Sequence, residues 1–179
     1  IFVPFAIPGE TVTVEIEEQK AHFARAKLLE VIEPAASRVE PRCPHFGECG
    51  GCQFQHMAYD AQLAVIPQIV ADQLKRIGGF ENVKVNTPIP HNLAWGYRAE
   101  IQLSPVTGGG LGFWSPSNQQ VIPIETCLII REELFNLWQD VDLELPGLRK
   151  LTLRIGDDEA MLAALEIDTH PEKYFGVLK

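Results

Sequence analysis

The sequence predicts an α+β chain, mostly β, in which a small antiparallel barrel precedes a β-rich domain with one long helix. Three patterns predict this class: apolar and polar residues alternate at 11–16, apolar residues recur with helical spacing over 59–77, and short strand-like runs follow Gly79. The 179 residues are 46% hydrophobic, enough for one large or two small domains. No apolar run approaches the roughly 20 residues that a membrane helix needs, so we expect no membrane partner.

Residues 1–42 are expected to form the barrel. The run 11–16 alternates as a half-buried strand does, and Pro8-Gly9 before it is a turn signal. Residues 23–32 form the second candidate strand. Their Ala and Leu content would also permit a helix, but the closing Val-Ile-Glu-Pro favours a strand. A small antiparallel barrel is the natural closure of such strands, and residues 34–44 are then a linker.

The region 43–179 is expected to be a second domain, with a helix over 59–77. Gly78-Gly79 ends this helix, and Pro67 inside it predicts a kink or a second helix with Pro67 in its first turn. Its apolar positions at helical spacing are Leu63, Ile66, Val70, Leu74 and Ile77. Strands are expected at 83–85, 98–103, 112–114 and 120–124, with a hairpin loop at 107–110, a helix at 132–141 and a hairpin of 151–155 with 161–167.

The net charge of −9 is a poor match to a free-standing nucleic-acid binder, which normally shows a basic face. We interpret Glu10, Glu15, Glu17 and Glu18 as an acidic face that serves solubility. Phe113 and Trp114 are interpreted as core residues.

The four cysteines are Cys43, Cys49, Cys52 and Cys127. Three of them form a Cys-x5-Cys-Gly-Gly-Cys cluster and the fourth follows far along the chain. Three closely spaced thiolates with one distant thiolate favour an iron–sulfur cluster, because zinc sites usually show two close pairs. Gly50 and Gly51 allow the backbone to turn tightly and free amides to bond sulfur. Two disulfides, structural zinc and unrelated buried thiols remain open alternatives.

Residues 42–56 read RCPHFGECGGCQFQH, which closely resembles the iron–sulfur motif of the RNA (uracil-5-)methyltransferases that use S-adenosylmethionine. The later segments GYR at 96–98, LGFW at 111–114 and VIPIETC at 121–127 resemble the central domain of that family in order and approximate spacing. Upstream, FVPFAIPGETV at 2–12 resembles the TRAM domain, a small OB-like RNA-binding barrel. The resemblance covers nearly the whole chain.

This resemblance implies a [4Fe–4S] cluster held by Cys43, Cys49, Cys52 and Cys127. It also implies a cytoplasmic enzyme of the 23S ribosomal RNA type, in which the barrel and cluster domain hold and refold structured RNA. In the family, a further domain binds S-adenosylmethionine and supplies the cysteine that attacks carbon 6 of uracil. This sequence shows no Gly-rich cofactor loop after a strand and no cysteine to spare, so we assign no catalytic residue and expect the chain alone to be inactive.

We therefore expect a fragment that lacks the catalytic domain and begins inside a longer protein, since residue 1 is not Met. The family's helix after the cysteine motif packs on the catalytic domain, so we expect 59–77 to lack its usual cover and to allow self-association. The rival functions are a non-catalytic RNA-binding iron–sulfur module and a ferredoxin-like electron carrier.

Several side chains are candidate RNA contacts. Tyr97 has a ring to stack on a base, and Arg98 has a guanidinium for a phosphate or, alternatively, for a carboxylate such as Glu100 or Glu125. His56 is interpreted as a hydrogen-bonded structural histidine, with a place near the cluster or RNA as the alternative. The candidate phosphate contacts, each with the alternative of a plain solvated charge, are Arg25, Lys27, Arg38 and Arg42.

Overall fold

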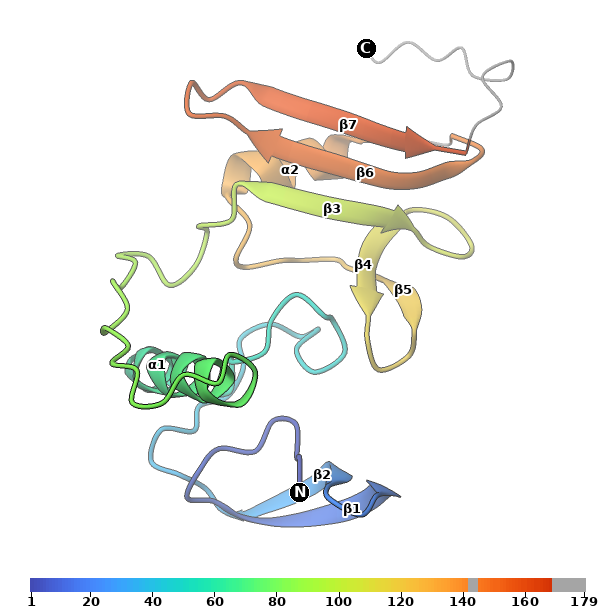
Figure 1. Ribbon diagram of the computed structural model, residues 1–179. Coiled ribbons are helices and arrows are strands. Elements are labelled where there is room, and N and C mark those ends of the chain that lie inside the picture. Colours follow the sequence, from blue (N-terminus) through green and yellow to red (C-terminus); the bar gives the residue numbers. More distant parts are fainter. Residues whose placement is uncertain (142–144, 169–179) are drawn as a thin grey trace. The chain divides into compact units, whose positions relative to one another are not determined.

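The computed structural model describes residues 1–141 and 145–168 (Figure 1). The chain divides into two compact units, each described by itself below. Unit 1 comprises residues 1–47 and 52–92, and unit 2 comprises 48–51 and 93–179. The centre of the cysteine motif therefore belongs to a different unit from its flanks. The expected domain boundary between residues 42 and 43 stays a prediction.

Unit 1 opens with a two-stranded antiparallel sheet of β1 (Thr11–Gln19) and β2 (Ala24–Glu33). Both predicted strands are confirmed. Phe2 adds a parallel bridge to Arg25: its amide donates to the Ala24 carbonyl at 2.8 Å and its carbonyl accepts from Ala26 at 2.9 Å. Within residues 1–33, the two strands and this bridge make up the regular β structure. A closed barrel goes beyond these elements and stays a prediction.

The long helix of unit 1 is α1 (Tyr59–Arg76), which matches the predicted helix to within one residue. Pro67 lies inside this single helix, so the alternative of a second helix starting near Pro67 is wrong. Gly79 ends the helix in the left-handed region at φ 68°, which a residue without Cβ adopts readily. The carbonyls of Leu74 and Lys75 then accept hydrogen bonds from the amides of Phe80 and Gly79. None of the α1 side chains is fully buried.

The segment after α1 differs from the prediction. Residues 83–85 form no strand, because a strand this short needs a neighbour to pair with and the described part of the chain provides none there. The segment is tied to the start of α1 instead: the His91 amide donates to the Tyr59 hydroxyl at 2.9 Å, and that hydroxyl lies 3.4 Å from the His91 carbonyl.

Unit 2 is built on a five-stranded antiparallel sheet in the order β5-β4-β3-β6-β7 (Figure 1). Its strands are β3 (Glu100–Pro105), β4 (Leu111–Ser115), β5 (Gln120–Pro123), β6 (Leu148–Ile155) and β7 (Met161–Ile167). The predicted strands and the hairpin around Gly156 are confirmed. Alternate residues of the central strands are buried, and α2 (Glu132–Asp140) adds Leu134 and Trp138 to the same core.

Gly112, Phe113 and Trp114 of the LGFW segment have different roles in the sheet. A Cβ on Gly112 would lie 1.9 Å from the Ile122 carbonyl oxygen, so only glycine allows β4 and β5 to pair here. Phe113 packs on the core, with its ring 5.7 Å from that of Trp138. Trp114 is 55% exposed, so its interpretation as a core residue was wrong. Its side chain alternates away from that of Phe113 along the strand.

Candidate functional site

The centre of the cysteine motif, residues 48–51, is anchored on the end of β4. The Gly50 amide donates to the Trp114 carbonyl at 3.1 Å, and the Asn118 side-chain amide donates to the Glu48 carboxylate at 3.0 Å. A Cβ on Gly50 would lie 2.9 Å from the Trp114 carbonyl oxygen. The Gly51 amide points at sulfur, 3.4 Å from Cys49 Sγ. Gly50 is therefore required because the Trp114 carbonyl lies too close for a Cβ, whereas Gly51 contributes a backbone amide to the Cys49 thiol.

Arg98 connects this loop to the segment that carries the distant cysteine. Its guanidinium Nη2 lies 3.4 Å from the Gly51 carbonyl oxygen, and its backbone amide donates to the Ile129 carbonyl at 2.8 Å. Cys49 and Cys127 both pack against the core of unit 2. Glu100, one of the carboxylates considered for Arg98, contacts Arg154 at 3.6 Å instead. Arg98 thus lies beside the loop of one cysteine and is hydrogen-bonded to the turn that follows the other.

Cys43 and Cys52 belong to unit 1. The Cys43 amide donates to the Gln55 side-chain oxygen at 3.2 Å, and the Cys43 carbonyl accepts from the Phe46 amide at 3.1 Å. None of the four cysteines forms a disulfide, so neither disulfide of the alternative interpretation is present. Among residues 1–141 and 145–168, no three Cys, His, Asp or Glu side chains form a group that could hold a metal ion. The predicted convergence of four thiolates is therefore unsupported by the structure, and the [4Fe–4S] cluster stays a prediction.

A partly buried ion pair lies in unit 1, with the Arg38 side chain 21% exposed and the Glu10 side chain 1% exposed. Arg38 Nη2 donates to the Glu10 carboxylate at 2.7 Å and to the Phe5 carbonyl at 2.8 Å, and Arg38 Nε donates to the other Glu10 oxygen. The amides of Ile7 and Ala35 also donate to this carboxylate, at 2.9 and 3.2 Å. These donors, Arg38 first, lower the pKa of Glu10 to about 2.

Glu10 was therefore misinterpreted as part of an acidic surface, since its side chain is 1% exposed. Sequence reasoning missed the pair because the two residues lie 28 positions apart. A phosphate contact by Arg38 would have to compete with Glu10.

Beside this pair, three rings meet. The ring centroids of Phe5, Phe46 and His56 lie 5.3 to 5.9 Å apart. His56 is 4% exposed, and its Nδ1 has no hydrogen-bond partner among the described residues. Burial lowers the pKa of His56, and the positive charge of Arg38 adds to this effect. His56 is thus buried, but its Nδ1 lacks the hydrogen bond expected of a structural histidine among the described residues.

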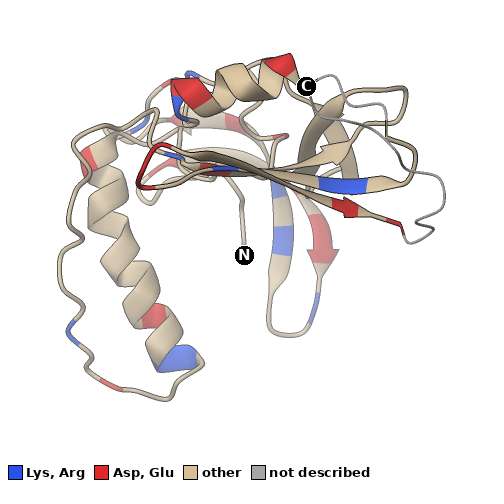
Figure 2. Cartoon of the chain, turned by 90° about the horizontal axis from the view of Figure 1, so that it is seen from above, with Lys and Arg blue, Asp and Glu red and all other residues tan. Residues whose placement is uncertain are grey.

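The other predicted RNA contacts are spread over both units. Arg25 and Lys27 are exposed on β2, where Arg25 lies 3.6 Å from Glu18 and 6.0 Å from the Phe23 ring centroid. Figure 2 shows that acidic residues flank these basic ones on the hairpin. Arg42 belongs to unit 1, and Tyr97, which is exposed, belongs to unit 2 with Arg98. Contacts of these residues with RNA stay predictions.

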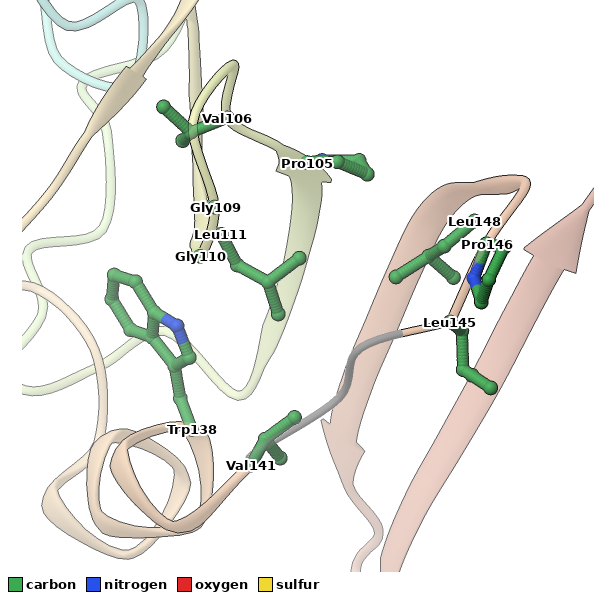
Figure 3. A pocket seen from close by; sticks show the side chains of 10 residues that line it. All are labelled: Pro105, Val106, Gly109, Gly110, Leu111, Trp138, Val141, Leu145, Pro146 and Leu148. Carbon is green, nitrogen blue, oxygen red and sulfur yellow. The ribbon is translucent and has the colours of Figure 1, made fainter. Parts of the chain in front are cut away.

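Each unit has a pocket of about 400 Å³. The pocket of unit 2 lies between the β3–β4 loop, the end of α2 and residues 145–148, with the ring of Trp138 pointing toward Gly110 and Leu111 (Figure 3). The pocket of unit 1 lies between residues 4–8, the segment after the cysteines and α1, and His56 is one of its lining residues. Within the described ranges, no helix has the length and apolar character needed to cross a membrane.

Comparisons with known proteins identify a similar domain and a similar solved structure. A family model for the TRAM domain matches residues 1–29. The crystal structure of the Pyrococcus abyssi tRNA (uracil-54, C5)-methyltransferase in complex with S-adenosyl-L-homocysteine is similar to 95% of this chain, with a TM-score of 0.56 and 26% identity. These matches confirm the resemblance to the RNA uracil-C5 methyltransferases.

Within this family, the chain is similar to enzymes named for ribosomal RNA. The 23S rRNA (uracil(1939)-C(5))-methyltransferase RlmD of Shewanella baltica strain OS155 is 33% identical over 100% of the chain, and that of Shewanella sp. strain ANA-3 is 37% identical over 76%. An uncharacterized RNA methyltransferase of Halalkalibacterium halodurans is 40% identical over 74%. The chain spans about a third of the length of these relatives, 30–39%.

Proposed function

We propose that this chain is the RNA-binding portion of an enzyme that transfers a methyl group from S-adenosylmethionine to carbon 5 of a uracil in 23S ribosomal RNA. The observation that carries the proposal is the match of the whole chain to an enzyme named for this reaction. The likeness of the fold to a tRNA uracil-C5 methyltransferase supports it. The cytoplasm is the proposed location, because ribosomal RNA is made and modified there.

The task of this chain is to hold structured RNA, with residues 1–42 as the TRAM barrel and 43–179 as the central domain. The exposed cations of β2 and the exposed ring of Tyr97 have the chemistry to contact phosphates and a base. We further propose that residues 1–179 alone do not transfer methyl groups. The sequence contains no Gly-rich cofactor loop after a strand, and its four cysteines are assigned to a cluster.

A [4Fe–4S] cluster ligated by Cys43, Cys49, Cys52 and Cys127 is part of this proposal. The residues fit in their chemistry: four cysteines outside any disulfide supply the donor set, the Gly51 amide donates to Cys49 Sγ, and Gly50 adds no side chain to the loop. When bound, the cluster would join distant parts of the chain through four thiolates. Arg98, bonded to the Gly51 carbonyl, would fix the loop and place a positive charge beside it.

A gene deletion tests the methyltransferase proposal. Deleting the gene that encodes this chain should remove one 5-methyluridine from 23S ribosomal RNA, and a plasmid copy of the gene should restore it. Mass spectrometry of nuclease fragments measures both. An unchanged content of 5-methyluridine in 23S RNA would contradict the proposal, and a loss confined to transfer RNA would change the substrate. Unchanged methylation together with RNA binding by the purified protein would favour a non-catalytic RNA-binding module.

We also propose that α1 pairs between two copies of this chain. Val70 and Ile77 are exposed on its apolar stripe, and Figure 2 shows a long uncharged stretch between charges near the two ends of the helix. Sedimentation at rising concentration should show a dimer, and Val70→Lys should shift it toward monomer. Gln68→Lys, on an exposed α1 position outside the stripe, is the control. A strictly monomeric wild type with strong hydrogen-exchange protection of α1 would contradict the pairing.

A further inference from the structure

The pocket of unit 1 is lined mainly by apolar side chains, with Gln53 and His56 as its polar residues. Phe5 and neighbouring residues form one wall, Phe54 and Met57 form a second, and Val65 and Ile69 of α1 form a third. Its volume is about 400 Å³. Among the described residues that line it, none is Lys, Arg, Asp or Glu. A ligand in this pocket must therefore present an uncharged and largely apolar surface, with any phosphate outside.

One polar group in this lining lacks a partner. His56 is almost completely buried, and its Nδ1 finds no hydrogen-bond partner among the described residues. A buried polar atom without a partner is costly, so native structures usually satisfy it or use it. Burial lowers the pKa of His56 and Arg38 adds to this effect, which favours the neutral imidazole with one donor and one acceptor nitrogen. A purely aliphatic ligand would leave Nδ1 unsatisfied, whereas a planar heterocycle has N–H groups and ring nitrogens at its edge.

The wall beside His56 is held in an unusual conformation. Phe5 has a φ of 65°, which side-chain-bearing residues rarely adopt. Arg38 donates to the Phe5 carbonyl, and the Glu10 carboxylate in turn fixes Arg38. The Phe5 ring contacts His56 edge-on, with 5.9 Å between the ring centroids. Such conformations cluster at ligand sites, where the surrounding structure holds them in place.

We propose that this pocket receives one unpaired nucleobase of the RNA, packed against Phe5, Phe54 and Ile69 with its polar edge at His56 Nδ1. Proteins that bind single-stranded RNA place unstacked bases on aromatic side chains and read their edges by hydrogen bonds. The uncharged lining suits a base and keeps the sugar–phosphate backbone outside. The proposal rests on the proposed function, which supplies RNA as the ligand.

A matched pair of variants tests the pocket. Ile69 and Val70 are neighbours on α1 with equal exposure, 41% and 40%, but Ile69 lines the pocket and Val70 does not. Ile69→Trp should fill the pocket and weaken binding of an unstructured RNA of about twelve nucleotides roughly tenfold. Val70→Trp keeps an apolar side chain on the stripe proposed to pair, and it should leave the Kd unchanged when wild type and variant are compared at a concentration where both have the same oligomeric state. Val65→Trp fills the same pocket from another position and serves if Ile69→Trp fails to fold, which circular dichroism reports.

Replacing each nucleotide of this RNA in turn by an abasic one locates the bound base. One abasic position should weaken binding to the wild type and to Val70→Trp, but add little loss to Ile69→Trp, whose pocket is already filled. Equal Kd values for Ile69→Trp and Val70→Trp, or abasic losses that are the same in both, overturn the proposal. This arm uses fluorescence anisotropy with the RNA labelled at one end.

A second measurement is independent of RNA affinity. Titration with uridine or adenosine should shift the ¹⁵N resonance of His56 Nδ1 in the wild type and in Val70→Trp, but not in Ile69→Trp. If the wild type bound no RNA, the RNA-binding role under the proposed function would fail, and this titration alone would decide the pocket. If RNA bound normally while His56 stayed unshifted and Ile69→Trp stayed neutral, only the pocket would be refuted.

Discussion

Arg38 donates hydrogen bonds to the buried carboxylate of Glu10, a residue 28 positions earlier in the chain, and the same guanidinium donates to the carbonyl of Phe5. One side chain thereby joins the segment before β1 to the segment after β2. Since Phe5 and His56 line the pocket of unit 1, this ion pair supports the fold and the candidate base pocket together.

Removing Arg38 should destabilise the chain strongly. Arg38→Ala leaves the Glu10 carboxylate without its cation; breaking a fully buried pair in this way costs about 3–5 kcal/mol, which is an upper bound here because the Arg38 side chain is 21% exposed. We expect the free energy of unfolding in urea to fall by that order. Arg25→Ala is the control, because Arg25 is exposed and a surface pair contributes at most about 1 kcal/mol. Equal losses in the two variants would show that the Arg38–Glu10 pair contributes little.

Acid should weaken the same link. The pKa of Glu10 falls from 4.5 in the unfolded chain to about 2 in the folded chain. Above pH 4.5 this stabilisation is fully present. As the pH falls from 4.5 toward 2 the unfolded state takes up the proton first, and about 3 kcal/mol is lost. Urea unfolding between pH 7 and pH 2.5 measures this loss. Glu10→Gln lacks the titrating group, so its stability should depend less on pH in this window. Parallel curves for the two proteins would contradict the assignment.

The two glycines of the cysteine motif should respond differently to alanine. A Cβ on Gly50 meets the Trp114 carbonyl at 2.9 Å and the Pro116 ring, whereas a Cβ on Gly51 lies in ordinary contact, 3.4 Å from Cys49 Sγ. Gly50→Ala should therefore lower the free energy of unfolding by about 1–3 kcal/mol through overpacking. Gly51→Ala should cost less. Thermal melting of both variants side by side tests the order, and a larger loss for Gly51→Ala would contradict it.

Anaerobically purified protein should contain about four irons and four acid-labile sulfides per chain, as one cubane cluster requires. Stoichiometric zinc without sulfide would refute the cluster. Cys127→Ser should lower the melting temperature of the loaded protein, because ligands that converge only in the folded state couple metal binding to folding. Thr126→Ser, a neighbouring change without a thiol, is the control. Equal melting temperatures for loaded wild type and Cys127→Ser would remove Cys127 from the ligand set.

Local sequence patterns correctly predicted those elements that depend mainly on neighbouring residues. The spacing of Leu63, Ile66, Val70 and Leu74 gave α1, and the Gly156 turn gave the β6–β7 hairpin. Residues 83–85 have the composition of a strand but no partner, and pairing is a property of the fold rather than of the segment.

The candidate site was harder to predict than the fold. The CGGC motif identified the cysteines, but the role of Glu10 depends on Arg38, and the unpartnered Nδ1 of His56 depends on three segments packing around it. Both Phe113 and Trp114 were interpreted as core residues, but successive side chains of a strand point to opposite faces, so a Phe113 that packs on the core implies an exposed Trp114. The exposure of Trp114 could therefore be predicted from the strand alone, whereas the long-range contacts of Glu10 and His56 could not.

The membership of residues 48–51 in unit 2 has a consequence for synthesis on the ribosome. Glu48 is synthesised 70 positions before Asn118, whose side-chain amide donates a hydrogen bond to it. Strand β4 follows the loop after a similar interval. At about 5–20 residues per second this delay is roughly 4–14 seconds. During that time the loop of the nascent chain lacks the strand that anchors it. Cys49, which packs against the core of unit 2 in the folded chain, is therefore more exposed to solvent during translation than after the sheet has formed.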